Sequence, residues 1–309
     1  MTLGEQPPAA TADATPTAPR VADVSCIAAT VIRVARITPR VVRVTFTVPG
    51  LRGTGSADEW VGIFFGEPGD HRQRRNYTIR AIRPEVDEVD IDFVPHDEGL
   101  AADWARAAAP GQTLAIWDQV GCGYDPPPDT DWRLLVGDAA AMPAIGRIIE
   151  ELPAGARAIV VAEIVDEHDR QTWASAADVE LRWLYGSGNG RAPSRLEEAL
   201  RTFPHPPGTG YIWMAGELRT VRAARRHLRH ELGLAGERYS LIGYWRTGGQ
   251  AWRSATRRSR PRWKRSGSAV RPTASTSRRS KTPTTPHWNR PGSDRRRPYR
   301  PTPTQERPT

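Results

Sequence analysis

Residues 125–152 read DPPPDTDWRLLVGDAAAMPAIGRIIEEL, and this stretch decides the fold class. It begins with a proline-rich linker, Asp125–Asp129, and continues into a short apolar run, Arg133–Val136, which is typical of a buried strand. After Gly137 the apolar residues recur at the i, i+3, i+4 and i+7 spacing of an amphipathic helix, at Ile145, Ile148, Ile149 and Leu152. A strand that leads directly into a helix predicts the first unit of a parallel α/β sheet.

The same alternation continues to residue 232. Strands are predicted at Ala158–Val165, Val179–Leu184 and Tyr211–Met214. Helices are predicted at Ser194–Phe203 and about Glu217–Leu232. In the second helix Leu218, Val221, Leu228 and Leu232 should face inward, and a solvated face should carry Arg219, Arg222, Arg225, Arg226 and Arg229. Residues 128–249 are therefore predicted to form a parallel α/β domain.

The preceding region, residues 21–127, has the period-2 pattern of half-buried strands. Apolar residues alternate with polar ones at Val42, Val44, Phe46 and Val48, and again at Val89, Ile91 and Phe93. Further strands are predicted at Trp60–Phe65 and Asn76–Ile82, with one helical insert at Leu100–Ala109. Short strands at this spacing predict an antiparallel barrel. A barrel followed by a nucleotide fold is a flavoreductase layout, although layout alone proves no activity.

Both ends of the chain differ from this body. Residues 1–20 are rich in Ala, Thr and Pro and are predicted to be disordered. Residues 250–309 contain 9 Pro and 17 Lys+Arg against 2 acidic residues, a formal charge of +15. Two interpretations are open for this basic segment: translation of a shifted reading frame in a GC-rich gene, which we favour, or a genuine disordered tail able to bind polyanions.

The composition of the chain excludes several classes of function. Residues 1–249 carry 27 Arg and 33 Asp+Glu, a formal charge of −6, so this part is a poor candidate for nucleic-acid binding. Cys26 and Cys122 are the only cysteines, which excludes a disulfide framework and any zinc or iron–sulfur site evident from spacing. We expect a cytoplasmic protein without membrane insertion, because no secretory signal and no apolar run of about 20 residues is visible.

The first chemical constellation is Arg75-Asn76-Tyr77-Thr78. On a strand Arg75 and Tyr77 share one face, and Asn76 and Thr78 share the other. A guanidinium can hold a phosphate in forked geometry, a tyrosine ring can pack on a flavin, and a threonine hydroxyl can bond to its redox-active edge. The alternative from these four residues alone is an ordinary barrel strand with an outward Arg and a core Tyr.

Five segments together resemble the siderophore-interacting protein family, also called ViuB-like ferric-siderophore reductases. The first, Arg74–Arg80, is similar to the family's R-x-Y-T flavin motif. Four others follow in order over about residues 24–248: Asp92–His96 with Gly99 and Trp104-Ala105, Gly137–Ala144, Trp213–Glu217 and Gly243–Gly248. The last of them, GYWRTG, resembles the family's G-Y-W-R-x-G and is the most specific.

The resemblance implies a flavin-binding barrel joined to a nicotinamide-binding domain, with FAD as cofactor. It implies that FAD or the nicotinamide contacts a set of residues along the chain: Arg75, Asn76, Tyr77, Thr78, His96, Gly99, Ala101, Ala102, Gly137, Asp138, Ala139, Gly216, Glu217, Tyr244 and Trp245. Four positions depart from the family pattern. Leu100 and Ala102 replace Pro and Ser, and Ala139 and Ala140 replace Glu and Thr, which removes polar side chains from both cofactor loops.

The function implied is an FAD-dependent ferric-siderophore reductase in which NADH or NADPH, or a ferredoxin-like donor, supplies electrons. Arg72, Arg74 and Arg246 are candidates for a positive rim that attracts the anionic chelate. The alternatives are a general NAD(P)H:flavin or diaphorase-type reductase, a non-catalytic flavin- or siderophore-binding protein, and a polyanion-binding protein that acts through residues 250–309.

Two further features carry less weight. Gly186-Ser187-Gly188-Asn189-Gly190 could cradle a phosphate, but the fingerprint is incomplete and a flexible turn is the favoured interpretation. His71 and His96 are each solitary and, from the residues alone, are interpreted as structural or solvated.

Overall fold

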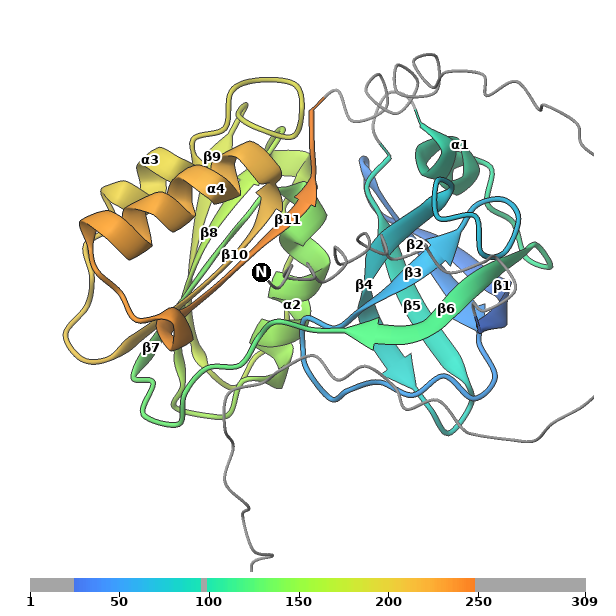
Figure 1. The fold of residues 1–309 in the computed structure, drawn as a ribbon, viewed down its shortest axis with the longest axis horizontal. Helices are drawn as coiled ribbons and strands as arrows, with labels where there is room; N and C mark the ends of the chain where they lie inside the picture. Colours follow the sequence, from blue (N-terminus) through green and yellow to red (C-terminus); the bar gives the residue numbers. More distant parts are fainter. Residues whose placement is uncertain (1–24, 96–98, 248–309) are drawn as a thin grey trace, which may run out of the picture. The chain divides into compact units, whose positions relative to one another are not determined.

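The computed structural model describes residues 25–95 and 99–247, and the predictions for residues 1–20, His96 and residues 250–309 lie outside them. Its first half is a closed six-stranded barrel in the order β1-β2-β5-β4-β3-β6 (Figure 1). Every neighbouring pair in the barrel is antiparallel. The strands are β1 (Cys26–Thr38), β2 (Val41–Thr47), β3 (Trp60–Phe64), β4 (Arg74–Arg83), β5 (Glu88–Phe93) and β6 (Thr113–Gly121).

The alternating pattern fills the barrel as expected. Phe46 and Ile91 are fully buried in its core, together with Val44, Val89 and Phe93. The polar residues between them pair across strands. For example, Arg43 Nε donates to Asp92 Oδ1 at 2.6 Å. Helix α1 (Leu100–Arg106) ends three residues before the predicted Ala109, which precedes Pro110, where helical geometry is disfavoured.

The second half is a five-stranded sheet in the order β11-β10-β7-β8-β9, with every neighbouring pair parallel. This confirms the predicted fold class of an antiparallel barrel followed by a parallel α/β domain. The strands are β7 (Trp132–Gly137), β8 (Arg157–Ile164), β9 (Asp178–Tyr185), β10 (Gly210–Glu217) and β11 (Tyr239–Trp245). The helices are α2 (Met142–Glu151), α3 (Leu196–Arg201) and α4 (Leu218–Arg226).

Helices cover both faces of this sheet. Successive residues of each strand point to opposite faces, so both faces carry apolar side chains that the helices bury. Leu134 and Val136 pack with α3 and α4 on one face. Leu135 packs with α2 on the other, and α2 lies between the sheet and the barrel (Figure 1). Burial on both sides explains why β7, β8 and β10 are largely continuous apolar runs, whereas the barrel strands alternate.

The helix predicted at Glu217–Leu232 differs in its last turns. α4 gives way to a π-helical turn at His227–Glu231, where Leu232 N donates to His227 O, five residues back. The wider turn rotates the following residue away from the sheet, so Leu232 is 43% exposed and the prediction that it faces inward is wrong. The five arginines lie on the exposed face, as predicted.

Polar contacts join the barrel to α2. Arg80 of β4 donates from both Nη atoms to the two Glu150 carboxylate oxygens, each at 2.7 Å. Arg147 Nη1 donates to Glu59 Oε1 at 2.8 Å and to the carbonyl oxygen of Ile79 at 3.0 Å. Among the described residues, no helix combines the length and apolar character needed to cross a membrane.

Candidate functional site

The predicted Arg-x-Tyr-Thr motif lies on β4, with its side chains on the two faces expected. The half-buried Tyr77 ring packs toward the barrel core, 4.5 Å between centroids from Phe93 and 6.1 Å from Phe65. Burial raises the pKa of the Tyr77 hydroxyl well above its ordinary value. Thr78 points from the opposite face and is buried, whereas Asn76 on that face is exposed.

Arg75 lies at the start of the same strand. Its Nη1 donates to the carbonyl oxygens of Arg72 at 2.9 Å and Arg74 at 2.8 Å. These bonds hold the guanidinium beside residues 72–74, at the start of β4. A guanidinium carries its N–H donors in a planar fork, the geometry that suits anionic oxygens.

Helix α1 reaches Tyr77 through shared aromatic neighbours. Trp104 lies 5.4 Å from Phe93 and 5.7 Å from Phe65 between ring centroids, the same two rings that contact Tyr77. Gly99 precedes the helix with a φ of 139°, and of the two alanines that follow it Ala101 is buried and Ala102 half-buried. The structure thus joins the α1 segment and the β4 motif around one aromatic cluster.

The other predicted residues gather at the carboxyl edge of the sheet, since all five strands are parallel. Gly137 ends β7 and is followed by Asp138 and Ala139, Gly216 and Glu217 end β10, and Tyr244 and Trp245 end β11. Chain order reverses between β7 and β10, and such a switch point is where open α/β sheets bind ligands.

Asp138 is the centre of this edge. It accepts from Trp245 Nε1 at 2.7 Å and from the Ala140 amide at 3.0 Å. Gly216 has a φ of 154°, and a Cβ there would lie 2.8 Å from Asp138 Oδ2, so the close approach of β10 requires glycine. Burial, with a smaller contribution from the charge of Glu163, raises the pKa of Asp138 to about 7 despite these bonds.

A cavity of about 540 Å³ opens beside Asp138, within the size range of ligand sites. Its lining includes Asp138, Glu163, Glu217, Trp245 and the loop residues 188–194. The cavity therefore adjoins Asp138, Glu217 and Trp245, three of the residues predicted to contact a cofactor.

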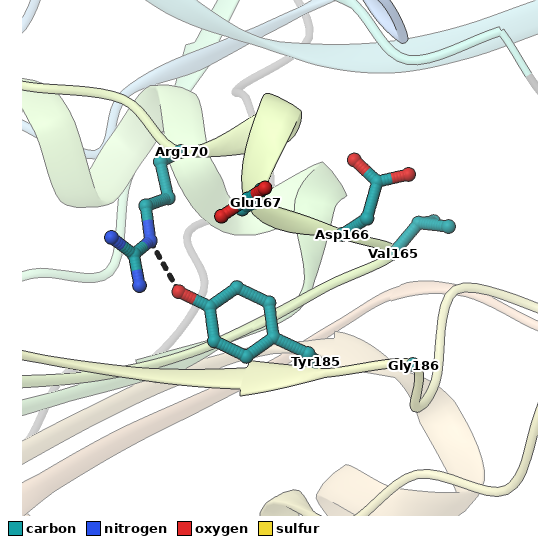
Figure 2. Close-up of a pocket in the computed structure, with 6 residues that line it drawn as sticks. All are labelled: Val165, Asp166, Glu167, Arg170, Tyr185 and Gly186. Carbon is teal, nitrogen blue, oxygen red and sulfur yellow. Dashed lines mark hydrogen bonds between the residues drawn. The ribbon is translucent and has the colours of Figure 1, made fainter.

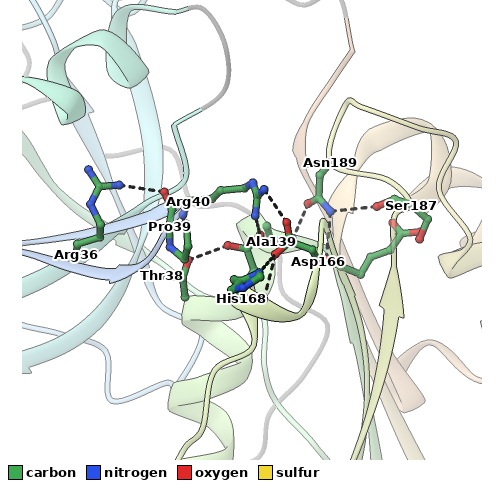
Figure 3. A network of polar contacts seen from close by, with 11 residues as sticks. Arg36, Thr38, Pro39, Arg40, Ala139, Asp166, His168, Ser187 and Asn189 are labelled. Atoms are coloured by element: carbon green, nitrogen blue, oxygen red, sulfur yellow. Dashed lines mark hydrogen bonds and ion pairs between the residues drawn. The ribbon is translucent and has the colours of Figure 1, made fainter.

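The glycine-rich loop beside this cavity contains a turn at residues 189–190 and is held by side-chain hydrogen bonds. Asn189 accepts from the Ala139 amide at 2.9 Å and donates to the carbonyl oxygens of Glu163 and Ser187, each at 3.2 Å (Figure 3). Gly188 has a φ of 62°, and a Cβ there would lie 2.0 Å from Glu163 Oε2, so the loop sits directly on that buried carboxylate.

The two halves of the predicted site meet at consecutive residues. The Tyr244 hydroxyl lies 3.4 Å from Thr78 Oγ1 on the barrel, and the next side chain, Trp245, bonds to Asp138 on the sheet. Groups bound at the barrel motif and at the sheet edge would therefore be neighbours.

The three arginines of the predicted positive rim have different surroundings. Arg72 is exposed and pairs with Asp70 at 2.8 Å. The Arg74 guanidinium carbon lies 4.5 Å from the centroid of the Trp117 ring, and its stem covers Gly62. Arg246 follows β11 and is exposed. His71 packs against the same Trp117 ring, in agreement with its structural interpretation.

A second cavity, of about 460 Å³, opens where β8 and β9 end (Figure 2). Arg170 Nε donates to the Tyr185 hydroxyl at one side of it. Asp166 on its other side accepts from Arg40 Nη2 at 2.7 Å, and Arg40 also donates to Asp169 (Figure 3). A barrel residue therefore fixes the loop that lines this cavity.

Sequence reasoning did not identify three of these residues as functional. Asp58 and Trp213 form a buried contact between the halves, with Trp213 Nε1 donating to Asp58 Oδ2 at 2.9 Å. Asn189 could have been found, because an asparagine between glycines favours a left-handed turn. Among residues 25–95 and 99–247, no group of three or more His, Cys, Asp or Glu could hold a metal ion.

The barrel, the doubly covered parallel sheet and a site at their meeting edge define a flavoreductase-type architecture. Sequence profiles described as "Siderophore-interacting protein" and "Siderophore-interacting FAD-binding domain" match residues 130–248 and 67–121. The chain belongs to the siderophore-interacting protein family.

Individual relatives agree with this placement. The chain is 31% identical to the siderophore-interacting protein SipS from Aeromonas hydrophila, covering 77% of this chain and 98% of that one with a TM-score of 0.62. The chain is 30% identical to a siderophore utilization protein from T. fusca, covering 73% of this chain and 94% of that one with a TM-score of 0.64. The chain is also 34% identical to the ferric vibriobactin reductase ViuB of Vibrio cholerae, over 56% of this chain and 65% of that protein.

Proposed function

We propose that the protein is an FAD-dependent ferric-siderophore reductase that draws electrons from NADH or NADPH. The observation that carries the proposal is the pair Tyr244–Trp245, whose side chains contact the barrel motif and the sheet edge respectively. When bound, FAD would accept a hydride from the nicotinamide and pass single electrons to Fe(III) in a chelate. Siderophore oxygens suit Fe(III) and hold Fe(II) more weakly, so reduction favours release of the iron.

The barrel residues fit a flavin. Arg75 would hold the phosphates, the half-buried Tyr77 ring would pack against the ring system, and Thr78 would bond to its redox-active edge. Asn76, Gly99 and the α1 residues Ala101 and Ala102 would complete the contacts. The shared aromatic cluster supports this assignment, because it fixes α1 and Tyr77 around the same rings.

The sheet edge fits a nicotinamide. Asp138 and Gly216 would flank it, and Trp245 would close the cavity of about 540 Å³. Gly137, Ala139 and Glu217 would contribute main-chain and carboxylate groups at the same edge. Ala139 keeps its amide bonded to Asn189, so the loop is shaped by the backbone although the polar side chains of the family pattern are missing.

The substrate would be an anionic ferric chelate that approaches the barrel rim. Arg74 supports this assignment, because its guanidinium lies over Trp117 and makes no salt bridge to a carboxylate among the described residues. Burial lowers the pKa of Arg74, but an arginine still carries its charge at neutral pH. Arg72 and Arg246 are the weaker members of the rim.

The test is a visible absorption spectrum of the purified full-length protein, followed by anaerobic addition of NADH or NADPH with a ferric catecholate present. Bound flavin that is bleached by the nicotinamide and reoxidised by the chelate, with Fe(II) trapped by a chromogenic ligand, supports the proposal. Rapid turnover with ferricyanide but none with the chelate indicates a diaphorase instead. A yellow protein inert to both nicotinamides and to a reduced ferredoxin indicates a binding protein.

Arg75→Ala provides a test of the phosphate assignment. Loss of a charge-assisted hydrogen bond costs about 1.5–3 kcal/mol, so FAD affinity should fall by about one to two orders of magnitude. Titration of the apoprotein with FAD, followed by flavin fluorescence, measures the change. Arg33→Ala, an exposed arginine on β1, is the matched control and should leave FAD affinity unchanged.

A further inference from the structure

Two consecutive carboxylates, Asp58 and Glu59, precede β3, and neither is exposed to solvent. They reach different elements of the α/β domain. Glu59 accepts from Arg147 of α2, whereas Asp58 accepts from Trp213 of β10. Neither contact belongs to the residues assigned above to the flavin or the nicotinamide, so the pair needs a separate explanation.

Asp58 is fully satisfied by three donors from three parts of the chain. Its Oδ1 accepts from Ser56 Oγ at 3.0 Å and from the Gly123 amide at 2.9 Å, and its Oδ2 accepts from Trp213 Nε1 at 2.9 Å. A buried carboxylate with this set of bonds has one orientation, because rotation would leave both the charge and the donors without partners. The Trp213 indole, itself fully buried, is therefore held in one position.

From Trp213 the contacts lead back to the barrel. The Tyr244 ring meets the Trp213 ring edge-to-face, with 6.4 Å between centroids and an interplanar angle of 81°. The Tyr244 hydroxyl then lies 3.4 Å from Thr78 Oγ1. Asp58 lies two residues before Trp60 of β3, and Trp60 pairs with Thr78 of β4. The path from Asp58 to Thr78 therefore ends on the strand next to the one where it begins. The contacts form a closed ring across the boundary between the barrel and the sheet.

We propose that Asp58 is a positioning residue for the flavin site, acting through Trp213 to set the Tyr244 hydroxyl against Thr78. The inference rests on the proposed function, in which Thr78 bonds to the flavin edge. Thr78 Oγ1 donates to the Tyr244 hydroxyl across 3.4 Å, so the position of Tyr244 directs the Thr78 hydrogen and decides which lone pairs Thr78 offers to the flavin. Burial raises the pKa of Tyr244, which keeps it a neutral hydroxyl whose oxygen accepts from Thr78 Oγ1.

The variants Asp58→Asn and Tyr244→Phe test this path. Asn cannot accept from all three donors with one oxygen, so Trp213 should shift. Tyr244→Phe removes only the hydroxyl that meets Thr78. We expect both to weaken FAD binding by about five- to tenfold, the loss of roughly one hydrogen bond, and to move the midpoint potential of the bound flavin in the same direction. The double variant should show no further change, since both substitutions act on one contact.

Glu59→Gln is the matched control, because Glu59 is adjacent and equally buried but contacts Arg147 instead of Trp213. It should lower stability and leave the flavin potential unchanged. An equal shift in Glu59→Gln, or independent and additive shifts in the two test variants, would mean that Asp58 only docks the halves together. Unchanged flavin properties in Asp58→Asn and Tyr244→Phe overturn this inference alone, whereas a wild-type protein that binds no FAD overturns the proposed function as well.

Discussion

At the scale of single residues, Asp138 shows how burial changes the chemistry of a side chain. Its position after β7 could be predicted from the strand-Gly-Asp order, but its ionisation could not. The carboxyl loses water on all sides, and the charge of Glu163 lies nearby, while Trp245 and the Ala140 amide compensate only in part. Glu163 and Trp245 come from two other strands, β8 and β11, so no local pattern reveals them.

The free energy of unfolding should depend on pH differently in wild type and in the Asp138→Asn variant. The folded protein holds the Asp138 proton up to about pH 7, whereas the unfolded chain releases it near the ordinary value of 3.8. Unfolding therefore becomes easier as pH rises through this window, because the folded state binds more protons. The contribution is about 4 kcal/mol, present below pH 4 and lost by about pH 7.

Urea unfolding of wild type and Asp138→Asn from pH 4 to pH 8 measures this effect. The neutral amide cannot titrate, so the difference between the two free energies of unfolding should change steadily across the window and level off above pH 7. Parallel profiles over the whole range would show that Asp138 ionises normally in the folded protein.

At the scale of elements, the sequence specified the regular parts well. The alternation at Val42–Val48 and the strand-helix order after residue 132 predicted β2, β7 and α2, because each burial pattern is contained within one element. The 13-residue β1 is interrupted by register shifts at Val31/Arg33 and Arg36/Thr38, which break its alternation. β11 was missed because its residues Tyr239–Trp245 have no regular burial pattern of their own.

The candidate site followed the same rule. Family-like segments located β4, the β7 edge and Tyr244–Trp245, since their residues lie close in sequence. Asp58 and Trp213 could not be paired from sequence, because 155 residues separate them. The bonds that hold the loop at 186–190 could not be predicted, because its partners are Glu163 of β8 and Ala139, two residues after β7.

Asn189→Gly tests whether that loop is held by its asparagine. Asn189 and Asp87 are the two non-glycine residues with positive φ among the described residues, at 57° and 53°. Glycine relieves the backbone strain at either position, but at 189 it also removes three hydrogen bonds and leaves the Ala139 amide without its partner. We expect a loss of about 1–3 kcal/mol in the free energy of unfolding.

Asp87→Gly is the control for this change. It alters the same kind of backbone position but removes only the bond from the Gly50 amide and an exposed ion pair with Arg52, so stability should change by less than about 0.5 kcal/mol. Hydrogen exchange at the Ala139 amide supplies a local measurement and should accelerate only in Asn189→Gly. Equal effects of both substitutions on stability and exchange would refute the special role of Asn189.

At the scale of the whole molecule, the barrel and the sheet are joined by buried polar contacts in addition to apolar packing. The Arg147 and Glu59 side chains are 8% and 0% exposed, so their ion pair is almost entirely out of water. Arg80 and Glu150 form a second pair across the same boundary, but the Glu150 side chain is 33% exposed. Pairs that differ in burial should differ in what their disruption costs.

Arg147→Met should therefore destabilise the protein by about 3–5 kcal/mol, because it leaves the Glu59 carboxylate buried without its cation. Arg80→Met should cost only about 1 kcal/mol or less, since water can solvate Glu150 once its partner is gone. Urea unfolding followed by tryptophan fluorescence gives both values. Adding Glu59→Gln to Arg147→Met removes the unpaired buried charge and should restore most of the lost free energy of unfolding. A buried ion pair contributes little beyond its own desolvation cost. Equal losses in the two single variants, or no recovery in the double variant, would show that the halves are held together by packing alone.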